Sequence, residues 1–153
     1  PPSQAPDAMV VLGRPAGYRG SYQQWKEDNI APQVVFEIVS PSNTFMEMAD
    51  KQRFYQQYGV EEMYFYNPKA KNFWGFVDKN GVWEFISDLN LPWVSPLLKI
   101  RFELFEDGLD VFYPNGEAFK TLAELVTERD EANAKLERAI AKMKAAGLDF
   151  SDL

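Results

Sequence analysis

The sequence contains neither cysteine nor histidine. Without cysteine the chain can form no disulfide and no thiolate metal site, which fits a reducing compartment, and we expect a cytoplasmic protein. Without histidine it can hold no Ser-His-Asp triad and no histidine-ligated zinc, and it lacks the commonest general base. Any chemistry must therefore come from carboxylates, lysine, tyrosine, serine or arginine.

Long apolar runs and a surplus of basic residues are also missing. No stretch reaches the about 18 apolar residues that a membrane span needs, and no basic-then-apolar leader is visible, so we expect no membrane partner. The formal net charge of −7 disfavours non-specific nucleic-acid binding over the whole surface, although a local basic groove stays possible. What is present, 153 residues of which 46% are hydrophobic, is enough for a globular domain with a real core.

The most informative stretch is the short apolar run from Val34 to Val39, which contains one carboxylate, Glu37. The run is rich in β-branched residues and lies between Pro32 and Pro41, so it predicts a strand buried on both faces. An unpaired charge in such a strand is destabilising. Glu37 must therefore be paired, protonated or bound to a metal ion.

A helix is expected directly after this strand. Thr44 and Glu47 have the spacing of a capping box, which starts a helix predicted from about residue 44 to residue 58, with Gly59 just beyond its C-terminus. Helical spacing places Lys51 on the face that also carries Tyr55. A cation is thus predicted on the face of the helix that packs against the sheet.

The rest of the chain predicts an α/β protein with a mixed central sheet, a core helix, an antiparallel hairpin extension and a long C-terminal helix. The other expected elements are a buried strand at residues 8–12, a strand at 61–66, hairpins at 73–86 and 97–113, and a helix at 118–146 that Gly147 ends. We expect one domain over residues 1–117. The segment 118–153 would be a helix with coiled-coil-like spacing, which either docks on its own domain or dimerises.

Asp7 directly precedes the first expected strand. If this strand neighbours the strand of Glu37, both carboxylates and Lys51 can face one spot. Two close carboxylates repel each other unless a cation lies between them, and oxygen donors favour hard ions such as Mg²⁺ or Mn²⁺. A divalent ion can generate hydroxide from bound water, and a nearby ammonium can orient that water or stabilise charge on a phosphate. The three residues predict a minimal phosphodiester hydrolase.

These residues resemble the Uma-type restriction endonucleases of the PD-(D/E)XK nuclease superfamily. Pro6-Asp7 matches the PD motif, and Glu37-Ile38-Val39 lies where the superfamily has (D/E)-x-K. Further matches are Ser40-Pro41-Ser42-Asn43, Lys51, Tyr55 and the run from Gly59 to Tyr64. The matches cover roughly residues 5 to 120; PD alone is a weak signal, but the motifs in this order are fairly specific.

The resemblance implies a restriction-endonuclease-like fold and a Mg²⁺-dependent endonuclease that acts on DNA. Asp7, Glu37 and the backbone carbonyl of Ile38 would hold the metal ion, and Lys51 would position or activate the attacking water. The third motif residue is Val39 rather than lysine. In this family the lysine lies on the following helix, which is where Lys51 is expected.

Two further departures concern other parts of the family pattern. Asn67 stands where the family has an acid, at the end of the strand after the helix. The family also places a helix and a strand before the PD motif, whereas only residues 1–5 precede it here. The chain would be either a fragment or completed by a partner, and an exposed strand edge favours association. We expect a homodimer.

Simpler interpretations exist for each of these residues. Glu37 could form a buried structural ion pair or be protonated, Asp7 could belong to a turn, and Lys51 could be a solvated surface group. The long loop after the first strand contains three basic residues that could contact DNA phosphates, or it could be an ordinary polar loop. These residues are Arg14, Arg19 and Lys26.

Two other functions compete with the nuclease. The first is a nuclease-like binding or assembly module without turnover, which oligomerises through its C-terminal helix. The second is a glycosidase, since aromatic residues are abundant and paired carboxylates can hydrolyse glycosidic bonds across an open sugar cleft.

Overall fold

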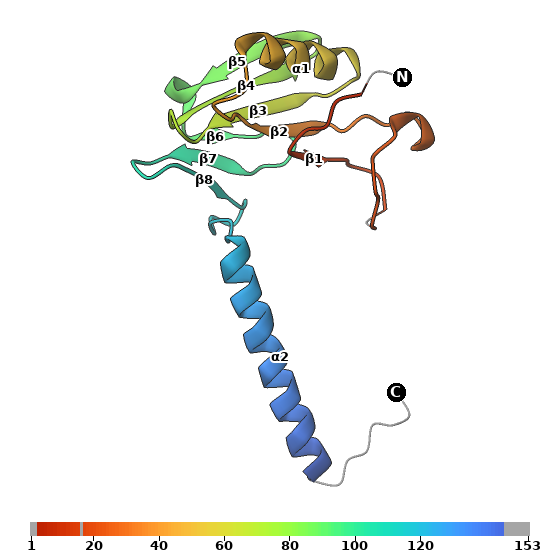
Figure 1. Ribbon diagram of the computed structural model, residues 1–153, viewed down its shortest axis with the longest axis vertical. Helices are drawn as coiled ribbons and strands as arrows, with labels where there is room; N and C mark the ends of the chain where they lie inside the picture. Colours follow the sequence, from red (N-terminus) through yellow and green to blue (C-terminus); the bar gives the residue numbers. More distant parts are fainter. Residues whose placement is uncertain (1–2, 16, 146–153) are drawn as a thin grey trace. The chain divides into compact units, whose positions relative to one another are not determined.

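The structure is a computed structural model that describes residues 3–15 and 17–145. The chain divides into two compact units, Pro1–Glu117 and Ala118–Leu153. The first unit holds a five-stranded sheet, helix α1 and a three-stranded sheet, and the second holds helix α2 (Figure 1). This is the mixed α/β architecture that the sequence predicts.

The five-stranded sheet has the order β1-β2-β3-β4-β5. Its central strands β2 and β3 are parallel, and all other neighbours are antiparallel. The strands are β1 (Ala8–Val10), β2 (Val34–Ile38), β3 (Glu62–Asn67), β4 (Asn72–Lys79) and β5 (Val82–Ser87). Helix α1 (Phe45–Gln57) connects the two parallel strands, which cannot be joined by a tight turn.

Helix α1 begins and ends where its sequence signals predict. The Thr44 hydroxyl accepts a hydrogen bond from the Glu47 N–H (3.2 Å), and the Glu47 carboxylate accepts one from the Thr44 N–H (2.6 Å). Gly59 follows the helix with a φ of +90°, a conformation that glycine adopts without strain. The predicted capping box and C-terminal glycine are both confirmed, so the helix follows β2 within a few residues.

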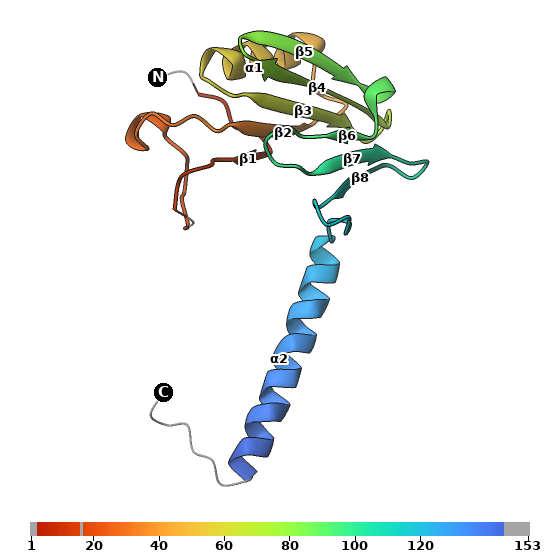
Figure 2. The ribbon, with the colours of Figure 1, turned by 180° about the vertical axis from the view of Figure 1, so that it is seen from behind.

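Two hydrophobic cores lie on opposite faces of the five-stranded sheet, which Figure 2 shows from behind. On one face Val35 and Met63 pack beneath Tyr55 of α1. On the other face Tyr64 packs against Phe102 of the three-stranded sheet, with ring centroids 4.8 Å apart. Successive strand residues point to opposite faces, so neighbouring residues of β2 and β3 serve different cores.

The three-stranded sheet is antiparallel and contains β6 (Trp93–Val94), β7 (Arg101–Leu104) and β8 (Leu109–Phe112). The predicted hairpin at 97–113 is present, but its first strand begins only at Arg101. A turn occupies the preceding residues: the Lys99 N–H donates to the Ser95 carbonyl (2.9 Å), and Lys99 has a φ of 60°. The short strand β6 is an addition that the sequence did not predict.

Strand β1 is a short edge strand rather than the buried strand expected at residues 8–12. It ends at Val10, and Met9 is 39% exposed. The apolar run is exposed because β1 pairs with β2 alone.

Helix α2 (Leu122–Ala145) begins later than predicted, after a capping box in which the Thr121 N–H donates to Glu124 (2.7 Å). None of its residues is buried. Gly147, the predicted end of the helix, lies outside the described residues. No helix within residues 3–15 and 17–145 has the length and apolar character to cross a membrane.

Candidate active site

Glu37 lies near the carboxyl end of β2 and points toward α1. It shares this face of the strand with Val35 and Val39, both of which pack in the core beneath the helix. The Glu37 side chain is 3% exposed. This buried carboxylate lies near the carboxyl end of a parallel strand, which is where α/β sheets usually bind ligands.

Two residues of α1 contact the Glu37 carboxylate. Lys51 Nζ lies 2.6 Å from Glu37 Oε2, and the Tyr55 hydroxyl donates a hydrogen bond to Oε1. Residues four apart on a helix lie on one face, so the helix delivers both groups together. The ion pair alone accounts for the charge inside the strand. The Lys51 side chain is 22% exposed, so its ammonium is not directed into bulk water.

Asp7 lies beside Glu37 across the β1–β2 pair. Ala8 is opposite Phe36 in the antiparallel register, so continuing the register by one residue places Asp7 opposite Glu37. Directly opposite side chains project from the same face of a sheet. Asp7 is exposed, and its Oδ2 accepts a hydrogen bond from the Ile38 N–H (2.7 Å). The structure thus brings together the three residues for which the sequence predicts catalysis.

Tyr55 is a site residue to which the sequence analysis gave no catalytic or metal-binding role, although it placed Tyr55 on the helix face of Lys51 and among the family matches. Burial raises the pKa of its phenol well above the usual value, and the hydrogen bond and charge of Glu37 raise it further, followed by the charge of Asp7. The phenol therefore stays protonated and keeps donating to Glu37. Its spacing of four residues from Lys51 indicates the shared helix face, but the spacing does not predict that the hydroxyl binds Glu37.

The departures from the superfamily pattern have structural explanations. Val39, which stands where lysine is usual, is 7% exposed and belongs to the core beneath α1. Lys51 supplies an ammonium beside the carboxylate from the helix instead. The side-chain oxygen of Asn67 accepts from two backbone N–H groups of the following turn, each at 3.0 Å, so this residue shapes the turn.

The donor set of the site suits a hard divalent ion. Asp7 and Glu37 supply carboxylates, and the Ile38 carbonyl is the next backbone donor along β2. No cluster of three or more acidic side chains that could hold a metal ion occurs among residues 3–15 and 17–145. Mg²⁺ commonly binds through one or two carboxylates, retains several waters and takes further ligands from a phosphate. The residues therefore fit an ion that water and substrate complete.

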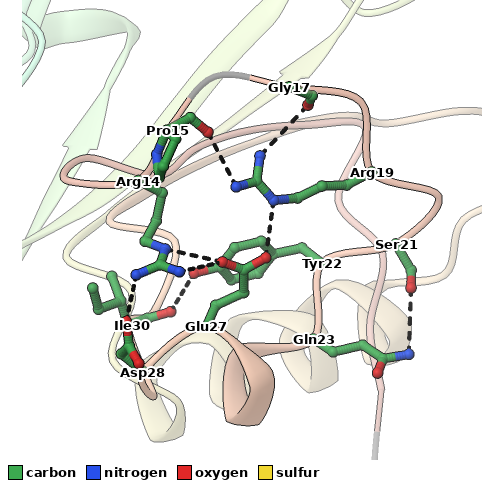
Figure 3. Close-up of polar contacts among 10 residues, drawn as sticks. All are labelled: Arg14, Pro15, Gly17, Arg19, Ser21, Tyr22, Gln23, Glu27, Asp28 and Ile30. Atoms are coloured by element: carbon green, nitrogen blue, oxygen red, sulfur yellow. Dashed lines mark hydrogen bonds and ion pairs between the residues drawn. The ribbon is translucent and has the colours of Figure 1, made fainter.

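Arg14 and Arg19 both bind Glu27 within the loop between β1 and β2 (Figure 3). Arg14 donates to Glu27 from Nε (2.9 Å) and also pairs with Asp28 (2.5 Å), while Arg19 Nε lies 2.9 Å from the other oxygen of Glu27. Hydrogen bonds from Arg19 and Arg14 lower the pKa of the Glu27 carboxyl. The two predicted DNA contacts therefore cross-link their own loop.

Lys26, the third predicted DNA contact, closes the short 3-10 helix Gln24–Lys26. It is exposed, and within the described part of the chain its ammonium forms no ion pair. Of the three basic residues, Lys26 is therefore the best placed to meet a phosphate without giving up another partner.

A hydrophobic groove of about 740 Å³ lies next to the carboxylates. Its lining includes aromatic side chains of α1, β3, β4 and β5, and it reaches Val39, two residues beyond Glu37. None of the three predicted catalytic residues lines it. The polar site and the groove are thus neighbours along β2 rather than one site.

A family model also matches the chain over this region. The model is Uma2, described as a putative restriction endonuclease, and it matches residues 2–111. The match covers more than half of the 153 residues and includes Asp7, Glu37 and Lys51. No curated protein and no solved structure matches the chain.

Proposed function

Because the chain belongs to the Uma2 family of putative restriction endonucleases, we propose that it is a metal-dependent endonuclease that hydrolyses phosphodiester bonds of DNA. The observation that carries the proposal is the position of Lys51 Nζ, 2.6 Å from a buried Glu37 whose neighbour across the sheet is Asp7. Two acids can hold a divalent ion and one ammonium can stabilise the charge that develops on a phosphate, and metal-assisted phosphodiester hydrolysis uses both. The family match favours this function over the glycosidase.

The two carboxylates are the proposed metal ligands. Asp7, Glu37 and the Ile38 carbonyl would hold Mg²⁺, or Mn²⁺ in its place. The bound ion supplies a Lewis acid and lowers the pKa of water. Asp7 already accepts a hydrogen bond from the Ile38 N–H, which ties the exposed acid to the strand that carries the buried one.

Lys51 and Tyr55 hold Glu37 in one orientation, because each binds a different carboxylate oxygen. An ammonium has three N–H donors, and Glu37 is the only acceptor of Lys51 among the described residues. The remaining donors can reach the attacking water or a phosphate oxygen, where positive charge stabilises the transition state.

DNA is the proposed substrate, and Lys26 is its best-placed phosphate contact outside the catalytic residues. Arg14 and Arg19 could bind phosphate only by exchanging it for Glu27, since both guanidinium groups are already paired. The net charge of −7 implies that DNA binding is local and sensitive to salt. An enzyme acting on intracellular DNA would be cytoplasmic, as the lack of cysteine also favours.

Plasmid cleavage with Mg²⁺ tests the assignment. Each of the single substitutions Asp7→Ala, Glu37→Ala and Lys51→Ala should reduce cleavage about 100-fold or more. Chelation of the metal ion should abolish cleavage. Asp50→Asn is the matched control, because Asp50 is an exposed carboxylate on the same helix that pairs with Arg53. Unchanged cleavage by the Glu37 variant would remove this site from the mechanism.

The second candidate is a nuclease-like assembly module without turnover. It is favoured by the Lys51–Glu37 ion pair, which satisfies the buried acid without a metal ion, and by helix α2, none of whose residues is buried. In either case we propose that the protein is a homodimer that associates through α2. Calorimetric titration with Mn²⁺ discriminates: the nuclease binds the ion and loses this binding in Glu37→Ala, whereas the module binds none at millimolar concentration.

A further inference from the structure

Helix α2 carries an apolar stripe that nothing in its own unit covers. Leu125 is 50% exposed, Leu136 58% and Met143 42%, and the helix has no buried residue. The stripe follows alternating steps of three and four residues, the spacing of a two-stranded coiled coil. Its positions are Leu122, Leu125, Arg129, Ala132, Leu136, Ala139 and Met143. An exposed stripe of this kind is typical of a helix that pairs with another helix.

The charges of α2 are segregated along its length. Residues 122–131 contain four acidic and one basic residue, a net charge of −3, whereas residues 132–145 contain one acidic and four basic residues, a net charge of +3. The helix dipole favours negative charge at the first turn and positive charge at the last turn, but it has little effect in between. On the flank of the stripe, however, Glu128 is followed one heptad later by Lys135, in the middle of the helix. Two copies of α2 are therefore complementary when they run in opposite directions.

The stripe itself also distinguishes the two directions. In a parallel, in-register pair each stripe residue meets its own copy, so two Arg129 guanidinium groups would face each other in the seam. In an antiparallel pair Arg129 can lie against Ala132 of the second copy, which leaves room for the long side chain. Burying like charges against each other is costly, whereas an arginine opposite a small residue can extend to solvent.

We propose that α2 forms an antiparallel pair with α2 of a second copy, centred between Asp130 and Glu131. In this register Leu125 lies against Leu136 of the second copy, and Glu128 lies beside Lys135 of the second copy, in two symmetric ion pairs. Shifting one helix by one heptad along the other would place Lys135 beside Lys135 of the second copy. Shifting it by one heptad in the opposite direction would place Glu128 beside Glu128 of the second copy. The charges thus select one register.

The pair spans residues 122–139 of each helix, about 27 Å at 1.5 Å per residue. Glu128 pairs with Lys120 in the single chain, 2.5 Å apart, whereas Lys135 has no ion pair among the described residues. This inference rests on the homodimer proposed above and not on nuclease activity. Cleavage by the single chain and pairing of α2 can therefore fail independently.

Disulfide cross-linking of the full chain tests the orientation, because the natural sequence contains no cysteine. Leu125→Cys and Leu136→Cys proteins are oxidised separately and as a mixture. The antiparallel pair predicts a cross-linked heterodimer in the mixture and little product from either protein alone. Cross-linking of each protein with itself would show a parallel pair and overturn the proposal. A wild-type chain that sediments as a monomer at all concentrations would also overturn it.

Charge reversal tests the register in the same full-length protein, with sedimentation equilibrium as the readout. Glu128→Lys should weaken dimerisation about tenfold or more, because two like-charged pairs replace two ion pairs. The double variant Glu128→Lys with Lys135→Glu should restore it. Glu137→Lys is the control, since this substitution makes the same change of charge on the opposite side of the helix, nine residues or two and a half turns after Glu128. Equal weakening by this control would contradict the assigned flank, and circular dichroism verifies that each variant stays helical.

Discussion

Glu37 and Glu62 are both buried carboxylates on neighbouring parallel strands, but they face opposite sides of the same sheet. Glu37 is 3% exposed and Glu62 1%. Among the residues that the structure describes, Glu62 accepts hydrogen bonds from neutral donors only: the Ser95 hydroxyl, the Tyr64 hydroxyl (2.9 Å) and the Leu97 N–H (2.7 Å). Glu37 instead binds an ammonium, and a second carboxylate, that of Asp7, lies opposite it at the start of the neighbouring strand and on the same face of the sheet.

The difference between the two sites lies in their partners and not in their burial. The donors to Glu62 belong largely to the segment between β5 and β7, so this carboxylate fastens the three-stranded sheet to the larger one. Glu37 has a cation on one oxygen and lies close to an exposed acid, which leaves a place for a ligand. A buried glutamate alone is therefore no sign of catalysis. The following experiments separate the two roles.

The largest effect is expected on cleavage when Glu37 is neutralised. Glu37→Gln should reduce plasmid cleavage about 1,000-fold, about 4 kcal/mol of transition-state stabilisation, because the amide is a poor metal ligand and no longer attracts Lys51. Folded Glu62→Gln protein should cleave at the wild-type rate. Equal losses in the two variants would mean that the comparison reflects stability and not chemistry.

The next effect is on stability when Glu62 is removed. Glu62→Ala leaves the Ser95 hydroxyl, the Tyr64 hydroxyl and the Leu97 N–H without their acceptor, so the free energy of unfolding should fall by about 3 kcal/mol. Urea unfolding measures this change. Glu61→Ala, at the exposed neighbouring position, should change the free energy of unfolding by less than about 0.5 kcal/mol. A similar loss in both variants would contradict a structural role for Glu62.

A third experiment perturbs the packing on the face of the sheet that carries Glu62 and leaves both carboxylates unchanged. A Cβ at Gly75 would lie 2.7 Å from Tyr64 Cδ1 and 2.8 Å from the Met63 carbonyl oxygen. Gly75→Ala should therefore displace the Tyr64 ring and lower the free energy of unfolding by about 1–3 kcal/mol. Gly20→Ala, where a Cβ meets nothing within 4 Å, is the control. Near-neutral Gly75→Ala would show that the ring can move freely.

The smallest effect is expected on the stability of the protein at alkaline pH, through the two tyrosines that donate hydrogen bonds to these glutamates. Burial is the main cause that raises the pKa of both Tyr55 and Tyr64, with additional contributions from Glu37 and Glu62 respectively. Above about pH 10 the unfolded chain loses phenolic protons that the folded state retains. Stability should therefore fall with rising pH, by up to about 1.4 kcal/mol per pH unit for each tyrosine.

Urea unfolding at several pH values between about 9 and 11 measures this slope. Tyr55→Phe and Tyr64→Phe should each remove part of it, because phenylalanine does not ionise in either state. A slope that neither substitution changes would place the alkaline sensitivity elsewhere in the chain.

The sequence predicted the site best where its signals are local. The run around Glu37, the capping box at Thr44 and the helical phase of Lys51 lie within one strand, turn and helix, and α1 places Lys51 against Glu37. The position of Asp7 required one further assumption, that its strand neighbours β2, and the register bears this out. The catalytic roles of these residues remain proposals.

The features that sequence reasoning missed depend on distant partners. The donors from Ser95 and Leu97 lie 33 and 35 residues from Glu62, and no periodic pattern connects them. The pairing of Arg14 with Glu27 was missed for the same reason, because both residues lie in an irregular loop in which no periodic pattern connects them. Strand β1 was expected to be buried because its residues are apolar, whereas exposure depends on how many strands lie beside it.

Because a hydrogen bond from the Ile38 N–H ties Asp7 to β2, we expect the site to open and reassemble without unfolding of the domain. Asp7 belongs to an arm with three residues in the sheet, whereas Glu37 lies in a central strand. Detachment of that arm would separate the two acids and withdraw Val10 from the edge of one core, and we expect it to require less free energy than global unfolding. Hydrogen–deuterium exchange of the Ile38 amide reports this opening, so a single backbone proton can measure how often the acids are apart.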